Sequence, residues 1–409
     1  MTRKILCLLC CLLLTGAAAL AEGGKVLSGQ AIVDGSSIYY AGSIDSAQEG
    51  VYFMNADGSG VSRLSDAYMT LLASEGGNLL AISFSESSVD YAVVVLNAMG
   101  EKTIVYDGYV AGGIASGGRF YWGVGSCALD GSDVRLLIDD AAHSYNYFPA
   151  AVSDGWYYYL DWAEYSENVF SEGESYPSAA RLCRLNLESG AVDVLSGYGA
   201  RFLGLDGSYL YYCRNSYWLY DEEEGETYEA GVVSGVFRVD LAALTTDQLA
   251  AFPDGGYAFV SYELMRDGVL YGTMSDYSGE NPVEQIVRMT LDGGQLPPFS
   301  LDNQAVTLHG IEDGVLYASV CSIDFSDDDY IQHDLLYALN TADGSFSLVN
   351  TPASDLLYFS ESPASVCVSG GRLYMIVFDN DAYAISFKSC ALDGSARVTL
   401  ARGYSLAAG

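Results

Sequence analysis

Basic residues and prolines are scarce in this sequence. Its 409 residues include 18 lysines and arginines against 53 aspartates and glutamates, which gives a formal charge of −35 at pH 7. Such an anionic surface repels phosphate backbones and anionic lipid, so the composition argues against binding to nucleic acid or to a membrane. The acidity either keeps the protein soluble and monomeric or attracts cations and basic peptides. With 8 prolines but 45 glycines and 33 tyrosines, the composition favours many short strands joined by tight turns.

Histidine is scarcer still, and no pattern of catalytic or zinc-binding residues is present. His143, His309 and His333 are far apart in the sequence, so each is predicted to be a polar loop or strand residue rather than a base or a ligand. There is no phosphate-binding glycine loop and no nucleophile elbow that leads into an α/β-hydrolase domain. Carboxylates are too numerous for their spacing to identify a glycosidase pair. No cofactor is predicted, although calcium could bind to the oxygens of residues 324–329 or 379–381, which lack the ordered EF-hand pattern.

Long hydrophobic runs are absent beyond the N-terminal segment, so nothing else is expected to anchor the chain in a membrane. Two basic residues precede an apolar stretch at 5–14, and residues 19–21 have the A-x-A form of a cleavage site. This order predicts a secretory signal peptide over residues 1–21, with a buried first helix as the alternative. The residues before Cys11 are not the small ones of a lipoprotein signal, which favours release into solution. The mature chain, with a charge of −37 after loss of two basic residues, is therefore expected outside the cell.

Short aromatic or aliphatic strands, each led by a glycine, recur along the chain. They are residues 37–40, 78–81, 119–122, 156–159, 209–212, 269–271, 315–317 and 372–374. Most are followed by a second strand that ends in Asp-Gly-Ser or a variant of it. The clearest of these turns start at Asp57, Asp130, Asp292, Asp343 and Asp393. A β-repeat with a period of about 35 to 60 residues is typical of a propeller, with one repeat to each blade.

Each repeat is predicted to be a four-stranded meander, whose strands we call a to d in chain order. Strand a ends at the glycine, strand b is the aromatic strand, a variable connection leads to strand c, and the Asp-Gly-Ser turn precedes strand d. The last repeat, residues 365–400, has all four strands of its own. No linker divides the repeats. Residues 22–409 are therefore predicted to form a single all-β propeller of eight blades, or of seven if the most divergent repeats merge.

Six cysteines follow the predicted signal peptide, and most are predicted to be unpaired. Cys127 and Cys390 both precede Ala-Leu-Asp-Gly-Ser, so they occupy the same place in different blades and lie too far apart for a disulfide. The chain is also large enough to build its own core, in which thiols serve as small apolar groups. The pairs best placed to be exceptions come from neighbouring repeats: Cys183 with Cys213, and Cys321 with Cys367.

The third repeat resembles a known family. Tyr121-Trp122-Gly123 followed by residues 129–137 resembles one repeat of the YWTD propellers of low-density-lipoprotein receptors, and residues 51–64 resemble a TolB-type repeat. The mature chain is similar to secreted bacterial proteins of uncharacterised function that carry such propellers. The full Tyr-Trp-Thr-Asp motif is not present, since Gly123 and Val124 follow Trp122. Both resemblances imply a propeller fold and binding of other proteins, and neither implies chemistry.

Topology predicts which end of the blades carries function. In a meander, the a–b and c–d turns lie at one end and the b–c and d–a connections at the other, and here the long insertions all belong to the second group. The b–c connections at 161–180, 214–235, 274–284 and 322–334 are rich in carboxylates and aromatic residues. Variable loops on a rigid scaffold usually carry function. The predicted ligand-binding residues are Asp161, Tyr165, Tyr217, Trp218, Tyr220, Asp324, Asp327, Asp329 and Tyr330.

Two functions of different class are compatible with these features. The first is a secreted, monomeric binding scaffold that presents an acidic, aromatic face to an extracellular protein, peptide or glycan, with aromatic anchors and carboxylates that select cationic partners. The second is a propeller enzyme of the glycosidase or lyase type with carboxylates at the central channel, which a buried pair of carboxylates with a raised pKa would favour. The absence of a catalytic signature favours the scaffold. The alternative for the acidic loops is that they are solvated and pack their aromatic residues on the blade edge.

Overall fold

The computed structural model describes most of the chain. The described ranges are 25–27, 29–43, 49–84, 91–162, 180–221, 226–230, 232–253, 258–277, 283–300, 305–325, 330–349, 361–379 and 384–405. The predicted signal peptide, residues 1–21, lies outside them. Within these ranges the helical structure is a single 3-10 helix, η2 (Ala141–Asn146), and no helix is long and apolar enough to cross a bilayer.

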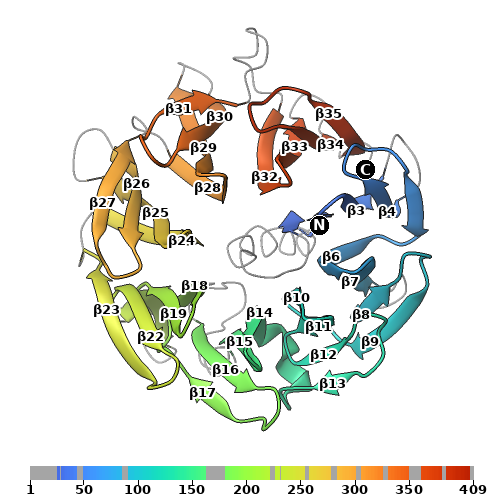
Figure 1. Ribbon diagram of the computed structural model, residues 1–409, viewed down its shortest axis with the longest axis horizontal. Helices are drawn as coiled ribbons and strands as arrows, with labels where there is room; N and C mark the ends of the chain where they lie inside the picture. The colour runs from blue at the N-terminus through green and yellow to red at the C-terminus, as the bar shows by residue number, and fades with distance from the viewer. Residues whose placement is uncertain are drawn as a thin grey trace. The chain divides into compact units, whose positions relative to one another are not determined.

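The strands form eight four-stranded antiparallel sheets in which strands a to d follow one another in chain order (Figure 1). Each sheet is one blade, and the blades are numbered 1 to 8 along the chain. Strand β1 (Lys25–Leu27) adds a fifth strand beside strand a of blade 1. The predicted all-β propeller fold with eight blades is confirmed. The alternative of seven blades is wrong, because the short third repeat and the divergent second repeat each form a complete sheet.

The blades belong to two compact units. Unit 1 covers Thr70–Asp254 and unit 2 covers Lys25–Met69 and Gly255–Gly409. Unit 1 holds blade 2 with β6 (Met69–Glu75), β7 (Asn78–Phe84), β8 (Tyr91–Leu96) and β9 (Lys102–Asp107), and blade 3 with β10 (Gly113–Ser116), β11 (Arg119–Trp122), β12 (Gly125–Ala128) and β13 (Arg135–Leu136). It also holds blade 4 with β14 (Tyr147–Ser153), β15 (Trp156–Asp161), β16 (Arg181–Asn186) and β17 (Val192–Val194), and blade 5 with β18 (Ala200–Asp206), β19 (Tyr209–Arg214), β22 (Gly235–Asp240) and β23 (Thr245–Ala251).

Unit 2 holds the first blade and the last three. Blade 1 consists of β2 (Ala31–Asp34), β3 (Ser37–Gly42), β4 (Gly50–Asn55) and β5 (Ser62–Ser65), and blade 6 of β24 (Ala258–Arg266), β25 (Val269–Asp276), β26 (Val283–Thr290) and β27 (Gln295–Ser300). Blade 7 consists of β28 (Ala305–Glu312), β29 (Val315–Phe325), β30 (Tyr330–Asn340) and β31 (Phe346–Leu348), and blade 8 of β32 (Glu361–Ser369), β33 (Arg372–Asp379), β34 (Ala384–Ala391) and β35 (Val398–Ser405). As predicted, the last blade contains four strands of its own.

The core of each unit lies between the faces of neighbouring blades. Strand b is apolar without alternation because it is covered on both faces, and in β15 the consecutive residues Tyr157, Tyr158 and Tyr159 are all buried. One cluster joins blades 2 to 4 around Trp122 and Tyr157, and another joins blades 4 and 5. In unit 2, separate clusters join blades 6 and 7, blades 7 and 8, and blades 8 and 1. Burial of aromatic and aliphatic side chains between sheets therefore provides the apolar stabilisation.

The Asp-Gly-Ser turns share one geometry. Asp57 Oδ1 accepts hydrogen bonds from the backbone nitrogen of Ser59 at 2.9 Å and from its hydroxyl at 2.6 Å. These bonds lower the pKa of the Asp57 carboxyl. The turns that start at Asp130, Asp343 and Asp393 repeat both bonds at similar lengths. The side chain of the aspartate thus closes the turn, which is the reason for its recurrence in the sequence.

The glycine of these turns is required for two reasons. Its φ is about +80°, a left-handed conformation that favours glycine, at Gly58, Gly131, Gly344 and Gly394. Each of these glycines also lies against strand d of the preceding blade or the residue after it. A Cβ on Gly131 would approach Thr103 to 2.9 Å, and one on Gly344 would approach Phe299 to 2.9 Å. The turn of one blade therefore docks on the outer strand of the blade before it.

Blade 1 packs on blade 8 through the same turn contact that joins blade 3 to blade 2 and blade 7 to blade 6. A Cβ on Gly58 would lie 3.1 Å from Leu400, in strand d of blade 8. The rings of Tyr40 and Phe387 stack with centroids 5.7 Å apart, and Lys25 Nζ donates a hydrogen bond to the carbonyl oxygen of Val368. The first and last blades are therefore neighbours within unit 2, although neither gives a main strand to the other.

The described cysteines confirm the prediction that most are unpaired. Cys127, Cys183, Cys367 and Cys390 are free, buried thiols. The two pairings proposed as exceptions are wrong, since each would need Cys183 or Cys367. Burial raises the pKa of Cys127 and Cys367 to about 12, so these thiols remain protonated and serve as small core residues.

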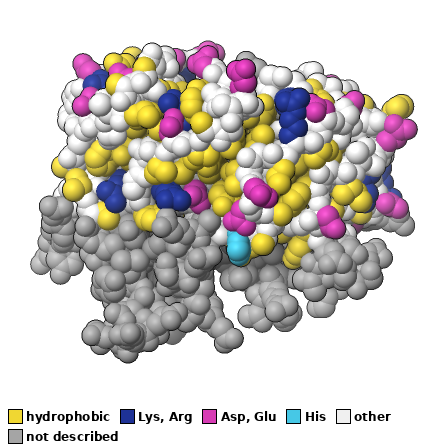
Figure 2. Space-filling view, turned by 90° about the horizontal axis from the view of Figure 1, so that it is seen from below, with side chains coloured by type: hydrophobic (Ala, Val, Ile, Leu, Met, Phe, Trp, Pro, Cys, Tyr) yellow, Lys and Arg dark blue, Asp and Glu magenta, His cyan; other side chains and the backbone are white. Residues whose placement is uncertain are grey.

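Exposed aliphatic side chains lie on the outer strands of blades 2, 3 and 4. Ile104 in β9, Leu136 in β13 and Val194 in β17 are exposed. Figure 2 shows hydrophobic side chains gathered on the described surface of one side of the molecule, with acidic and basic groups scattered among them. Strands β13 and β17 contain only 2 and 3 residues. Such short outer strands offer little backbone for pairing with another sheet, which limits aggregation at these edges.

Strand a carries a β-bulge at the same place in blades 4 to 8. The pairing with strand b skips one residue in each of these strands: Ala150, Leu203, Glu263, His309 and Ala364. Bulges of this kind bend a strand and redirect one side chain. In blade 7 the bulged residue is His309, whose Nε2 lies 2.8 Å from Ser319 Oγ. Burial lowers the pKa of His309 to about 4, so the imidazole is neutral near pH 7.

The bulged histidine should make stability depend on pH. Because the pKa of His309 is lower in the folded state than the usual 6.5, the unfolded chain binds a proton first as the pH falls. Stability is therefore complete above pH ~6.5 and is lost progressively down to pH ~4, by about 2 kcal/mol for a partly buried imidazole. Urea unfolding across this range should show a weaker pH dependence for His309→Gln than for the unmodified protein. Equal pH dependence in the two proteins would contradict this assignment.

Candidate functional site

The two ends of a blade differ in what they carry. The a–b and c–d turns lie at one end, which we call the turn edge, and the b–c and d–a connections lie at the other, which we call the insertion edge. In unit 1 the insertion edge of blades 3 to 5 comprises the described residues of 137–147, 161–162, 180–181, 195–200 and 214–230. Chemically reactive and aromatic side chains gather at this insertion edge.

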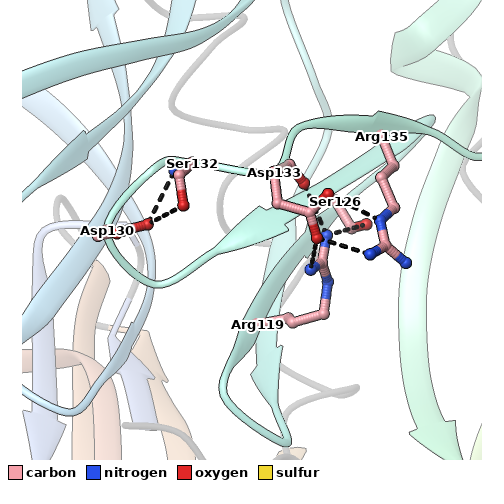
Figure 3. Close-up of polar contacts among 6 residues, drawn as sticks. All are labelled: Arg119, Ser126, Asp130, Ser132, Asp133 and Arg135. Carbon is pink, nitrogen blue, oxygen red and sulfur yellow. Dashed lines mark hydrogen bonds and ion pairs between the residues drawn. The ribbon is translucent and has the colours of Figure 1, made fainter.

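Charged groups at the turn edge of blade 3 contact one another. In blade 3, Asp133 accepts from Arg119 Nη1 at 2.7 Å and from Arg135 Nη2 at 2.6 Å (Figure 3). Arg119 Nη2 also donates to Ser126 Oγ at 3.2 Å. Blade 8 repeats the arrangement, with Arg372 Nη2 donating to Ser389 Oγ at 3.0 Å. The turn edge is therefore a structural surface in these blades.

Helix η2 crosses over the b–c turn of blade 3. A Cβ on Gly123 would lie 2.7 Å from the carbonyl oxygen of Ser144 and 2.8 Å from that of Tyr147, so only glycine fits below the helix. Ser144 Oγ donates to the carbonyl oxygen of Tyr109 at 2.6 Å, and Tyr106 Oη donates to that of Ala141 at 2.9 Å. The chain departs from the Tyr-Trp-Thr-Asp motif at Gly123 because a side chain there would displace η2.

A carboxylate, an imidazole and a phenol meet at the start of η2. Asp140 Oδ1 lies 3.0 Å from His143 Nδ1, and Asp140 Oδ2 accepts a hydrogen bond from Tyr147 Oη at 2.9 Å. The side chain of His143 is 42% exposed. Tyr147 is buried, and burial, the bond to Asp140 and the charge of Asp161 together raise the pKa of its hydroxyl. The result is a carboxylate held by two donors, with an imidazole that reaches solvent.

An ion pair closes the base of the blade 4 insertion. Arg181 donates to Asp161 Oδ2 from Nε at 2.9 Å and from Nη2 at 2.8 Å, and the two residues are paired across β15 and β16. The side chains of Asp161 and Arg181 are 8% and 28% exposed. Although burial opposes it, the hydrogen bonds and charge of Asp161 raise the pKa of Arg181. The Arg181 guanidinium also lies 5.7 Å from the ring centroid of Tyr198.

Aromatic side chains support these groups from below. Trp162 packs on Phe148 with centroids 5.2 Å apart, and its backbone nitrogen donates to the carbonyl oxygen of Asn146 at 3.0 Å. Tyr147 contacts Tyr159 edge-on at 6.0 Å, and Tyr159 stacks on Tyr157 at 5.5 Å. These contacts hold η2 and the first residues of the blade 4 insertion against the core.

The predicted binding residues belong to different kinds of local structure. Asp161 is buried in the ion pair with Arg181. Tyr217, Trp218 and Tyr220 lie in β20 (Tyr217–Asp221), which pairs with β21 (Glu226–Ala230) to form a separate two-stranded hairpin between strands b and c of blade 5. The segment 214–235 is thus partly a hairpin and not a simple loop.

The blade 7 connection differs in the same way. Asp324 lies near the end of β29, and Tyr330 begins β30, so the strands extend through most of the segment predicted as the loop 322–334. Tyr165, Asp327 and Asp329 lie outside the described residues. The extension follows from the β-branched and aromatic residues on both sides of the turn. Ligand contact at all nine predicted residues remains a prediction.

Sequence reasoning missed Asp140, His143, Tyr147 and Arg181. The first three belong to a d–a connection, and only the longer b–c connections were considered as sites. Asp140 stands three residues before His143, the spacing at which side chains meet on one helical turn. That spacing could have revealed the contact.

No metal centre is evident in the described part of the chain, where no group of three or more histidine, cysteine or acidic side chains could hold an ion. The runs suggested for calcium, 324–329 and 379–381, extend beyond the residues whose side chains are described. Calcium binding there remains a prediction.

No family model matches the sequence, and no curated protein matches it. Among solved structures, dipeptidyl peptidase 4 of Porphyromonas gingivalis is similar over 96% of this chain and 61% of its own, with 11% identity and a TM-score of 0.55. This chain therefore spans less than two thirds of that peptidase.

An oligogalacturonate lyase in complex with manganese is similar over 87% of this chain and 94% of its own, with 12% identity and a TM-score of 0.40. A chain of the nidogen/laminin complex is similar over 66% of this chain and 86% of its own, with 15% identity and a TM-score of 0.31. At this identity the likeness to the peptidase concerns the fold alone, and the other two carry no argument.

Proposed function

We propose that this protein is a non-catalytic binding scaffold whose insertion edge contacts a protein, peptide or glycan partner. The proposal includes the secreted location predicted from residues 1–21 and a monomeric state. The observation that carries it is that the insertion edge of blades 3 to 5 holds aromatic and ionisable groups anchored from below, two of which, His143 and Tyr145, reach solvent.

Anchored aromatic side chains suit a contact surface. Tyr145 is 46% exposed on η2, beside His143 with ring centroids 6.2 Å apart. Because η2 is held over Gly123 and against Tyr109, the ring loses little conformational freedom when a partner covers it. Tyrosine and tryptophan are favoured anchors at interfaces for this reason. The hairpin of β20 and β21 adds Tyr217, Trp218 and Tyr220 to the same edge of unit 1.

The enzyme alternative has less support at this edge. A glycosidase or lyase of the predicted type would need two carboxylates that act together. The buried carboxylate described here, Asp161, faces Arg181 instead. Its partner there is a guanidinium and not a second carboxyl group.

The test begins with a pull-down from the native extracellular milieu, followed by two matched variants. Tyr145→Ala, at the insertion edge, should weaken partner binding by about 2 kcal/mol, the cost of truncating an interface anchor. Tyr209→Ala is the control, because Tyr209 is 36% exposed at the turn edge. It should leave binding within about 0.5 kcal/mol. Equal losses, or a loss for Tyr209→Ala alone, would show that the partner binds elsewhere.

A further inference from the structure

The imidazole of His143 has a defined proton position. Its Nδ1 lies 3.0 Å from Asp140 Oδ1, and an ionised carboxylate can only accept a hydrogen bond. The neutral ring must therefore carry its proton on Nδ1, which leaves the lone pair of Nε2 unprotonated. Tyr147 holds the other oxygen of Asp140 at 2.9 Å, so the carboxylate cannot rotate away from the ring. Orientation of a histidine by a carboxylate is typical of imidazoles whose second nitrogen meets a ligand.

The surroundings of His143 favour a cation as that ligand. On its own connection lie Asp140 and the exposed Asp139. From the packed elements come Tyr106 of β9, Tyr109, and Tyr147 of β14, all neutral near pH 7. Among the described residues that interact with Tyr147, the other charges are Asp161 and Arg181, which neutralise each other in their ion pair. With a neutral imidazole, the group around His143 therefore has a net negative charge.

An aromatic ring completes the arrangement. The exposed Tyr145 ring lies edge-on to His143, with centroids 6.2 Å apart. A cation above an aromatic face is attracted by the ring, and its N–H groups can donate to Nε2. The whole protein is strongly anionic and attracts cations over a longer range.

We propose that His143 Nε2 and the Tyr145 ring form a binding site for an ammonium or guanidinium group of a basic peptide segment. This inference rests on the proposed function, because it assigns a chemistry to the partner of the insertion edge. Protonation of His143 would remove the acceptor and add a positive charge. Binding should therefore be weaker in acidic than in neutral solution.

The first experiment reads the proton position directly. Nitrogen-15 NMR of histidine-labelled mature protein at about pH 7.5, with His143 assigned by comparison with His143→Gln, should show the proton on Nδ1. In Asp140→Asn the Nδ1–H preference should weaken, because the amide no longer offers only acceptors. A proton on Nε2 in the unmodified protein would overturn the proposal, since Nε2 could then accept nothing.

The second experiment uses tetralysine as the probe, in calorimetric titrations of the mature protein. Affinity should fall roughly tenfold between about pH 7.5 and pH 5.5, the loss expected for one hydrogen bond to a charged group. His143→Gln keeps a neutral acceptor and should bind tetralysine with little pH dependence. Glu188→Gln removes an exposed carboxylate from the turn edge of blade 4 and should change neither affinity nor pH dependence. A pH dependence that persists in His143→Gln, or an equal loss in Glu188→Gln, would overturn the site.

The two proposals fail separately. If Tyr145→Ala weakens binding of the natural partner while His143→Gln leaves tetralysine binding unchanged, the proposed contact surface holds and the proposed cation site does not. If tetralysine binding depends on His143 while only Tyr209→Ala weakens binding of the natural partner, the cation site exists, but the natural partner binds at another edge.

Discussion

Replacing Gly394 with alanine is expected to lower the free energy of unfolding by about 3 kcal/mol. Gly394 has a φ of +80°, where a side chain costs about 1 kcal/mol. Its Cβ would also overlap the carbonyl oxygen of Val349, the residue that follows strand d of blade 7. Because the obstacle is backbone, relief requires moving blade 8 away from blade 7, and such overpacking costs about 1 to 3 kcal/mol more. Urea unfolding measures the loss.

Gly190→Ala separates the two contributions. Gly190 occupies the corresponding c–d turn of blade 4 with a φ of +71°, and a Cβ there would meet nothing within 4 Å. This variant should lose only the conformational cost of about 1 kcal/mol. If the two variants are destabilised equally, docking of the turn on the preceding blade contributes nothing, and the contact described at Gly394 is not a constraint.

Asp161→Asn is expected to lower the free energy of unfolding by about 2 to 3 kcal/mol. The substitution leaves the Arg181 guanidinium, 28% exposed, without its carboxylate at the base of the blade 4 insertion. Removing one member of a buried pair costs about 3 to 5 kcal/mol, and partial solvation of Arg181 reduces that value. Tyr147 and Tyr159 lie close to Asp161, so the near-ultraviolet circular dichroism of the tyrosines should change as well.

Two comparisons test the origin of that loss. Asp247→Asn disrupts the exposed pair with Arg238 and should cost less than about 1 kcal/mol. Asp161→Asn combined with Arg181→Met removes both charges and should recover part of the stability, because no unpaired buried charge remains. A double variant no more stable than Asp161→Asn would show that packing, and not charge, is responsible.

The number of blades could be predicted from local sequence because each blade contains an aromatic or aliphatic strand led by a glycine, and most blades also contain an Asp-Gly-Ser turn or a variant of it. A glycine before an aromatic strand and an Asp-Gly-Ser turn are both short-range patterns, and the bonds from Asp57 to Ser59 show that the turn is closed by its own residues. A c–d turn that lacks Asp-Gly-Ser can be closed in the same way, by a side chain of the turn itself. In blade 4, Asn186 Oδ1 accepts from the backbone nitrogen of Ser189 at 2.8 Å and so replaces the aspartate.

The candidate site was less accessible to sequence reasoning. The numbers of carboxylates and aromatic residues pointed to the b–c connections. Of the residues predicted there, Asp161 does lie at the insertion edge. The counts could not show that Asp161 is neutralised by Arg181, since 20 residues separate them in the chain. Nor could they bring Asp140 to Tyr147 and His143, because the path of η2 over Gly123 depends on the close approach of two backbone segments.

By itself, the sequence determined the all-β class, the eight four-stranded blades and the place of each tight turn. These follow from strand composition and turn chemistry, which act between residues close together in the chain. Tertiary structure alone decided which glycines dock on a neighbouring blade, which thiols stay unpaired, and which charged groups meet at the insertion edge. Each of those outcomes depends on contacts between residues distant in sequence, as at Gly58 and Leu400 or Asp161 and Arg181. Such contacts leave no local pattern, because they arise only when strands distant in the sequence pair within a sheet or when neighbouring sheets pack face to face.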